Sequence, residues 1–504
     1  MSTTANSGLY TELRKRQRAI EGRIARYRAK IADSERELEE CLEMLQLFPR
    51  TYPVLTLPNE ITTEIFLYSN LPSLMGREST PNPHYAPMLL LHVCRAWRAI
   101  AIATPRLWAN LWLDFSCLPS RFFEAENLDK FLAEYVVRLG ACPLSLKLTG
   151  YFQSEEIEDD GKRLVASIFH QLSSRLEVLN LVTEIDYYRE HHSHFPLLRK
   201  LTVGFPHYTD ESDLIGLDER PIQTFSAAPQ RQLYLFNKAI PSHFAILWET
   251  LTVFTGEELL SRDCVEVLRL APSITKCIFE SEINMHADFP TLTHPNLKST
   301  NGSEALIRFV TFPALQDLEV YADDMNDVQL LKFISRSAST LLKLSTTDVS
   351  LQSLHAMSIL THLHLYAPNS NYLSGPSGFL TMLNRTLNPG FLPQLQTLEF
   401  EDCKPFVNVH FANVLSSRAV AQDGAAKLRS FRQIWSRSQF HALRVDYTEY
   451  IAYLFEELAE DGMEIYIGLP RRYVSSIALI SIPVGNHCGY KLFSFSQSFP
   501  FQLA

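Results

Sequence analysis

The sequence predicts an α/β fold, in which a horseshoe-shaped solenoid of strand-and-helix repeats follows two helical segments. Three observations lead to this prediction. A heptad pattern of apolar residues opens the chain, a group of short apolar helices follows it, and a leucine motif then recurs at nearly constant spacing. The chain has 504 residues, which is too many for one ordinary core, so several domains or an extended array are expected.

A coiled-coil helix is predicted for residues 10–48, after a disordered stretch at residues 1–9. Nine of its eleven heptad positions are apolar, and no proline interrupts them. These positions are Tyr10, Leu13, Gln17, Ile20, Ile24, Tyr27, Ile31, Ser34, Leu38, Cys41 and Leu45. Residues 11–30 carry eight Lys or Arg against two Glu, whereas residues 31–50 carry six acidic residues against two Arg. An antiparallel partner would pair these opposite charges, and a helix that folds back on its own domain fits equally well.

Residues 54–115 have the pattern of three short helices around a small apolar core. Pro58 suits the first turn of a helix, and a second helix ends before Pro105. Their apolar positions are Leu57, Ile61, Ile65 and Tyr68 in the first helix, Leu90, Val93, Cys94, Trp97, Ile100 and Ala101 in the second, and Leu107, Trp108, Leu111 and Trp112 in the third cluster. So small a core usually needs a partner or a neighbouring domain. Docking on another protein and a self-contained helical core are the two interpretations.

This segment resembles an F-box. The resemblance is carried by Leu-Pro-x-Glu-Ile at residues 57–61, Val-Cys-Arg-x-Trp-Arg at residues 93–98 and Pro-x-Leu-Trp at residues 105–108. It implies docking on the small Skp adaptor of cullin–RING ubiquitin ligases, and with the preceding coil it is similar to a large family in mushroom-forming fungi. The residues implied to face the adaptor, or to support that face, are Leu57, Pro58, Glu60, Ile61, Ile65, Val93, Cys94 and Trp97. Thr62 and Ser69 replace apolar residues that are usual in the family, which would weaken adaptor binding.

Residues 140–470 carry the motif L-x-x-L-x-L, with other apolar residues allowed. Clear copies begin at Leu176, Leu198, Trp248, Ile274, Leu315, Leu360 and Leu395, and weaker ones at Ile222, Leu297, Leu341 and Leu428. From residue 176 to residue 360 successive copies start 18 to 26 residues apart, which is typical of leucine-rich repeats. Residues 327–337 and 449–462 have the pattern of connecting helices. The alternative is a non-repeating α/β domain, but eleven matches at this spacing favour a divergent repeat array.

The motif also predicts a binding surface. Its leucines point into the solenoid, and the residues between them point outward along the concave wall. The outward positions chosen as candidates for binding a target protein are Asp317, Glu319, Tyr321, His362, His364, Tyr366, Glu399 and Glu401. Their mixed polarity suits protein recognition, although a plain solvated strand edge would look the same.

No pattern of catalytic or cofactor-binding residues stands out in the sequence. A phosphate-binding loop, H-E-x-x-H and a cysteine–histidine nucleophile signature are all absent from it. His191, His192 and His194, and the pair His362 and His364, lack the set of carboxylate or cysteine ligands that selective metal sites show, so no metal site is predicted. The chain is therefore expected to be neither an enzyme nor a cofactor-dependent protein.

Composition narrows the partners and the compartment. The net charge of −10 argues against binding to nucleic acid or to anionic membranes. Eight cysteines without a C-x-x-C pair indicate reduced thiols in the cytoplasm or nucleus. Neither a signal-peptide core nor a transmembrane run of apolar residues is expected. Residues 471–504 form an apolar tail of unclear role.

The function implied by the resemblance is that of a substrate-recognition subunit of a Skp–cullin–F-box ubiquitin ligase. The F-box would dock the adaptor, the repeats would bind a target protein, and catalysis would arise from proximity alone. Two alternatives remain. One is an adaptor-bound scaffold outside ubiquitin transfer, and the other is a repeat and coiled-coil interaction protein that binds no adaptor.

Overall fold

The computed structural model describes most of the chain. The described residues are 3–47, 57–69, 81–117, 125–150, 158–189, 191, 193–206, 217, 220–280, 290–301, 304–320, 327–337, 340–347, 349–367, 378–402, 409–421, 424–435 and 449–468. The predicted apolar tail and the candidate residues Tyr321 and His192 lie outside them. The chain divides into two compact units, one of Met1–Glu78 with Asn82–Leu107 and the other of Ser79–Pro81 with Trp108–Ala504.

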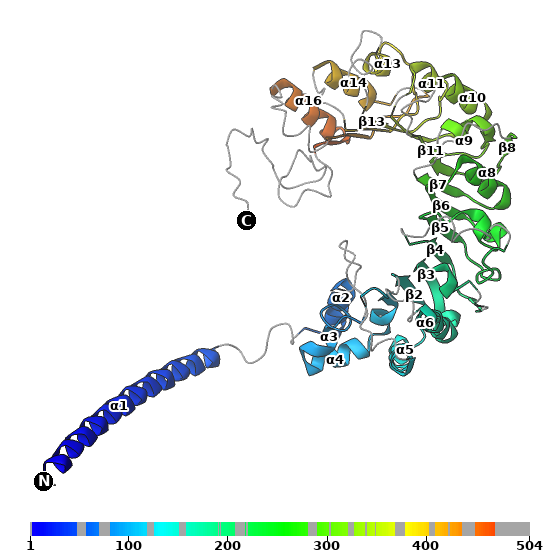
Figure 1. Ribbon diagram of the computed structural model, residues 1–504. Coiled ribbons are helices and arrows are strands. Elements are labelled where there is room, and N and C mark those ends of the chain that lie inside the picture. Colours follow the sequence, from blue (N-terminus) through cyan, green and yellow to red (C-terminus); the bar gives the residue numbers. More distant parts are fainter. Residues whose placement is uncertain are drawn as a thin grey trace. The chain divides into compact units, whose positions relative to one another are not determined.

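The first unit begins with one long helix, α1 (Thr3–Leu47), as the heptad pattern predicts (Figure 1). The helix starts at Thr3, so it includes most of residues 1–9, for which disorder was expected. Extending a nucleated helix is easy where no proline intervenes. Every side chain described in α1, from residue 11 to residue 44, is exposed. Within the described part of the chain, the apolar heptad positions are therefore uncovered.

Three more helices belong to this unit: α2 (Asn59–Ser69), α3 (Leu90–Val93) and α4 (Arg95–Ile102). The second predicted helix is thus two helices, separated at Cys94. The backbone of Cys94 is extended, with φ −158° and ψ 170°, and its Sγ accepts a hydrogen bond from the backbone N–H of Trp97 at 3.4 Å. Cys94 therefore ends α3 and caps α4, a position that short polar side chains usually take.

The third predicted helix is a short 3₁₀ turn, η2 (Pro105–Trp108), followed by strand β1 (Asn110–Asp114). Burial alternates along β1, which is the period of a strand and not of a helix. Trp108 is fully buried and lies edge-on to Tyr135 at 5.5 Å, and the Tyr135 hydroxyl donates to the carbonyl of Asn110 at 2.7 Å. Leu111 and Trp112 therefore belong to the sheet of the second unit.

The second unit is mixed α/β and is built on a long parallel sheet. In the described residues, fourteen strands form one sheet in chain order, each parallel to the next (Figure 1). They are β1, β2 (Leu144–Thr149), β3 (Leu176–Val182), β4 (Lys200–Gly204), β5 (Gln232–Phe236), β6 (Val253–Glu257), β7 (Lys276–Glu280), β9 (Ser299–Asn301), β11 (Asp317–Val320), β12 (Lys343–Thr346), β13 (His362–Tyr366), β14 (Thr397–Glu401), β15 (Ser430–Ile434) and β16 (Glu464–Gly468). Two further short strands, β8 (Leu292–Thr293) and β10 (Val310–Thr311), pair with each other.

Helices and 3₁₀ turns connect the strands, and Figure 1 shows the helices along one side of the sheet. The helices are α5 (Ala125–Leu139), α6 (Glu158–Leu172), α8 (Ser261–Leu270), α9 (Glu304–Phe309), α10 (Asp327–Ser337), α11 (Leu351–His355), α13 (Phe379–Leu383), α14 (Val409–Ala419) and α16 (Glu449–Glu460). Parallel neighbours require such crossover connections. The predicted helices at residues 327–337 and 449–462 are confirmed as α10 and α16.

The strand register stacks the leucine motif into a core. Leu318, Leu344, Leu363 and Leu398 are register partners on β11 to β14, and none is more than 1% exposed. Alternate residues on the same strands point to the opposite face. One face of the sheet therefore packs against the connections, and the other carries the polar side chains.

Two of the eleven motif copies do not coincide with the strands of the sheet. Ile222 forms only an isolated bridge with Phe244, and the nearby strand is β5, which the motif missed because Gln230 stands where the first leucine would be. Gln230 is nevertheless fully buried. The copy at Trp248 is out of register, since Leu251 and Phe254 are buried while Trp248 belongs to a 3₁₀ turn, η8 (Trp248–Thr250).

Across the described ranges, none of the helices combines the length and the apolar character needed to cross a lipid bilayer.

Candidate functional site

The first candidate surface lies on α2, α3 and α4. The core of this part contains Phe66, Leu90 and Ala101, each at most 5% exposed. The predicted adaptor-facing residues Ile61, Ile65 and Val93 are instead 50%, 46% and 51% exposed. Leu57, Pro58 and Glu60 are exposed as well, and Cys94 and Trp97 are half-buried. The helices thus leave apolar side chains at the solvent after their own core is formed.

Trp97 has a different role from the exposed apolar residues. Its ring packs against Phe66, with ring centroids 5.0 Å apart at an angle of 63°. Its indole Nε1 is buried, and among the described residues it has no hydrogen-bond partner. Trp97 therefore supports the small core of these helices.

Thr62 and Ser69, the two residues that depart from the F-box pattern, both donate a side-chain hydrogen bond to a backbone carbonyl. Thr62 is 3% exposed, and its hydroxyl donates to the carbonyl of Pro58 at 3.2 Å. Ser69 donates to the carbonyl of Phe66 at 2.8 Å near the end of α2. Because Thr62 faces inward with its hydroxyl satisfied, it removes no apolar area from the exposed side of α2.

The second candidate surface is the face of β11 to β15 opposite the leucine core, which is here called the polar sheet face. All the predicted target-binding positions that the structure describes lie on it: Asp317 and Glu319 on β11, His362, His364 and Tyr366 on β13, and Glu399 and Glu401 on β14. The register places His364 opposite Glu399, and Tyr366 opposite Glu401. The outward positions of the leucine motif therefore lie together on one face of adjacent strands.

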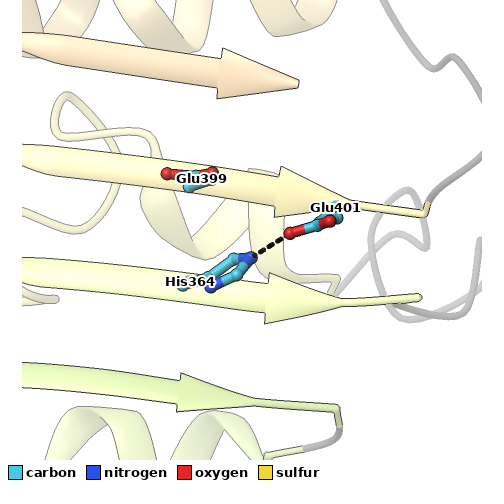
Figure 2. A group of neighbouring side chains, drawn as sticks. All are labelled: His364, Glu399 and Glu401. Atoms are coloured by element: carbon cyan, nitrogen blue, oxygen red, sulfur yellow. Dashed lines mark ion pairs between the residues drawn. The ribbon is translucent and has the colours of Figure 1, made fainter. Parts of the chain in front are cut away.

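Several specific contacts tie this face together. Nε2 of His364 lies 3.4 Å from Oε2 of Glu401, and Figure 2 shows the imidazole directed toward that carboxylate. The His364 ring also lies 4.9 Å from the ring of Tyr366. On the next strand, a guanidinium nitrogen of Arg432 lies 3.4 Å from Oε2 of Glu399. Arg432 was not among the predicted residues, although it occupies the same motif position as His364 and Glu399.

The carboxylates shape the local electrostatics. Burial raises the pKa of Tyr366 to about 12, and the charge of Glu401, its hydrogen bond with the phenol, and the charges of Glu319 and Glu399 act in the same direction. Burial also lowers the pKa of His362, and the Lys343 charge adds to this, while Asp317 opposes it. Carboxylates on β11 and β14 therefore act on the phenol of Tyr366 in addition to burial.

The expectation that His364 has no carboxylate company is wrong. In the structure His364 forms a group with Glu399 and Glu401, in which one donor atom from each residue lies within 4.8 Å of the others. The carboxylates come from the next repeat, about 35 residues later in the chain, so only the strand register reveals them.

Comparison with known proteins leaves the chain without an assigned family, since no protein-family model matches it and no curated protein matches it either.

Proposed function

We propose that this chain is the substrate-recognition subunit of a Skp–cullin–F-box ubiquitin ligase. In this proposal α2, α3, α4 and η2 form the F-box, and the long parallel sheet with its connections is a divergent leucine-rich-repeat solenoid. The chain would bind its adaptor and its target and would perform no chemistry, because holding the target near the ubiquitin-charged enzyme is sufficient for transfer.

The observation that carries the proposal is the exposure of Ile61, Ile65 and Val93. These residues stand at positions where the resemblance implies adaptor contact, and each is about half exposed. Burying the remaining apolar area of one such side chain would contribute about 1 kcal/mol, and a central anchor contributes more. A helical unit of this size gains stability from such a partner.

The sheet supports the second half of the proposal. Its strands follow chain order, its leucines stack in one core, and its polar sheet face carries acidic, aromatic and histidine side chains on adjacent strands. A parallel sheet with connections on one side leaves the other face open along its length. A protein target would bind across β11 to β15, where the negative charge is concentrated.

The test is an adaptor-binding assay with two matched variants. Ile65 and Ile102 are equally exposed, at 46% and 45%, but only Ile65 is a predicted adaptor residue. Ile65→Ala should weaken binding to a purified Skp-type adaptor by about 2 kcal/mol, or roughly 30-fold, whereas Ile102→Ala should leave it within about 2-fold. Equal binding by the two variants, or no adaptor binding by the unaltered chain, would contradict the proposal.

Cullin recruitment separates a ligase subunit from an adaptor-bound scaffold. The purified chain–adaptor pair should bind a cullin and support ubiquitin transfer to a bound target. A pair that excludes the cullin would favour the scaffold function.

A further inference from the structure

The group His364, Glu399 and Glu401 has a geometry that recognition of a protein target does not require. The three residues lie on neighbouring strands β13 and β14, and Figure 2 shows His364 and Glu401 directed toward each other with Glu399 nearby on β14. One donor atom of each lies within 4.8 Å of the other two. Imidazole nitrogen and carboxylate oxygens are ligands that divalent transition ions accept.

The distance between His364 and Glu401 suits a shared ion. Two donors bound to one tetrahedral zinc at about 2.1 Å lie about 3.4 Å apart. Nε2 of His364 and Oε2 of Glu401 are 3.4 Å apart. Glu399 lies opposite His364 in the register, and one of its carboxylate oxygens lies within 4.8 Å of the donor atoms of the other two residues.

The imidazole nitrogen of His364 lacks a better partner in the described residues. Nε2 is buried and makes no hydrogen bond, because its contact with Glu401 has the distance of an ion pair without hydrogen-bond geometry. A buried polar atom without a partner is costly and calls for an explanation. An ion between His364 and the two carboxylates would satisfy it.

The charges on the polar sheet face favour a cation. Across β11 to β15 this face carries four carboxylates, those of Asp317, Glu319, Glu399 and Glu401, and two permanent cations, Lys343 and Arg432. The carboxylates exceed these two cations by two negative charges, which one divalent ion would offset. The three candidate ligands are also partly shielded from water, with side chains 19% to 27% exposed.

Neighbouring side chains already hold the two carboxylates. The phenol of Tyr366 is hydrogen-bonded to Glu401, and Arg432 contacts one oxygen of Glu399 at 3.4 Å. A carboxylate has two oxygens, so Glu399 can keep Arg432 on Oε2 and offer Oε1 to an ion. Outer contacts of this kind orient metal ligands in known sites.

We propose that His364, Glu399 and Glu401 bind one divalent transition-metal ion of the zinc class on the polar sheet face. The histidine disfavours calcium and magnesium, which prefer sites made of oxygen ligands alone. Three protein ligands leave at least one coordination position for water or for a donor group of a bound protein, as in zinc sites that do not serve structure alone.

Direct metal binding tests this proposal on the full-length chain, purified without a histidine tag and freed of metal with a chelator. Equilibrium dialysis against Zn²⁺ should show about one more bound ion per chain in the unaltered protein than in His364→Gln. Glu399→Gln/Glu401→Gln should lose the same ion, and glutamine keeps the shape of the glutamate side chain.

His362→Gln is the matched control. His362 lies on the same strand and the same face, but its register partner on β14 is Thr397, which offers no carboxylate. The control should bind as much Zn²⁺ as the unaltered chain. Equal Zn²⁺ binding by His364→Gln and the unaltered chain, or an equal loss in His362→Gln, would overturn the proposal.

A second measurement reports coordination directly. Co²⁺ added to the metal-free chain should give a visible absorption band that His364→Gln lacks, with circular dichroism showing that the variant is folded. The absence of a difference between the two spectra would also overturn the proposal. Neither readout involves the adaptor, so failure of the metal site and failure of the proposed ligase function are distinguishable.

Discussion

The helical unit and the sheet unit differ in how far their apolar side chains are exposed. On the sheet, register partners such as Leu318, Leu344 and Leu363 are at most 1% exposed. On the helices, Ile24 of α1 and Ile65 of α2 remain 44% and 46% exposed. The sheet therefore completes its core within the chain, whereas the helices keep apolar surface that only another surface can cover. We therefore expect structural stability to reside in the sheet, and the exposed apolar side chains of the helices are where the proposed partners would bind.

The largest effect is expected in the sheet core. Leu363→Ala in the middle of β13 should lower the free energy of unfolding by about 3 to 4 kcal/mol, because it removes buried methyl groups and leaves a cavity. Urea unfolding followed by circular dichroism measures it. The control is Leu387→Ala, at a leucine that is 61% exposed, which should change the stability by less than about 0.5 kcal/mol. Similar losses in both variants would remove the contrast between buried and exposed leucines.

A buried arginine should show the next largest effect. Arg418 is 0% exposed and donates hydrogen bonds to the carbonyls of Leu383, Phe391 and Leu392 at 2.5 to 2.8 Å. Burial lowers its pKa, and the charge of Arg385 acts in the same direction. Arg418→Met would leave buried carbonyls unpaired while relieving that repulsion, so we expect a net loss of about 2 to 3 kcal/mol in urea unfolding.

Arg269→Met is the control for this loss. Arg269 is exposed and, among the described residues, pairs with Glu266 on the same helix, an interaction that solvent screening weakens. If Arg418→Met unfolds at the same urea concentration as Arg269→Met, the carbonyl contacts do not stabilise the sheet unit.

The exposed apolar heptad positions of α1 predict that the chain self-associates through this helix. Ile24→Asn should weaken a coiled-coil dimer by about 2 kcal/mol, measured as the dissociation constant in sedimentation velocity. Ala25→Asn, outside the heptad positions, should change it little. In an antiparallel dimer the basic half of one helix faces the acidic half of the other, so added salt should weaken the dimer. Strengthening by salt would indicate a parallel arrangement, and a monomeric chain would refute self-association.

Much of the sheet could be predicted because its motif repeats. Leu360 and Leu395 begin two copies, and residues at the same place in each copy, such as His364 and Glu399, become register partners. Alignment of the copies predicts that His364, Glu399 and Arg432 are neighbours, since each stands four positions after its copy begins. Glu401 stands six positions after Leu395, opposite Tyr366, so these neighbours are one repeat apart in the chain.

Other features depend on the burial and hydrogen bonding of single polar side chains, which the apolar pattern does not predict. Gln230 is buried at a leucine position, so strand β5 was missed. Cys94 caps α4 through its sulfur, so one predicted helix became two. Thr62 was expected to weaken adaptor binding, but its side chain points inward and donates to the backbone carbonyl of Pro58. Gln230 is buried where the motif expects leucine, whereas Cys94 and Thr62 bond to the backbone within one helical turn.

The smallest effect is expected on the face of the sheet opposite the leucine core. It tests whether side chains on this face are partly shielded from water. On β2, Nζ of Lys147 lies 3.9 Å above the ring of Trp112 on β1. Burial lowers the pKa of Lys147 below its ordinary 10.5, and the charge of Asp114 opposes the shift. Between the lowered pKa and about pH 10.5 the unfolded chain binds more protons than the folded chain, so stability contributed at this residue rises with pH.

Urea unfolding near pH 8 and near pH 10.5 should therefore show the unaltered chain gaining stability relative to Lys147→Gln as the pH rises. Lys276→Gln is the control, because Lys276 is exposed on the same face of β7. A pH-independent difference for Lys147→Gln would mean that this end of the face is fully hydrated. A stability difference that rises with pH for Lys147→Gln and not for Lys276→Gln would show that the sheet shields side chains from water outside its leucine core. The exposed helices of the first unit do not shield theirs.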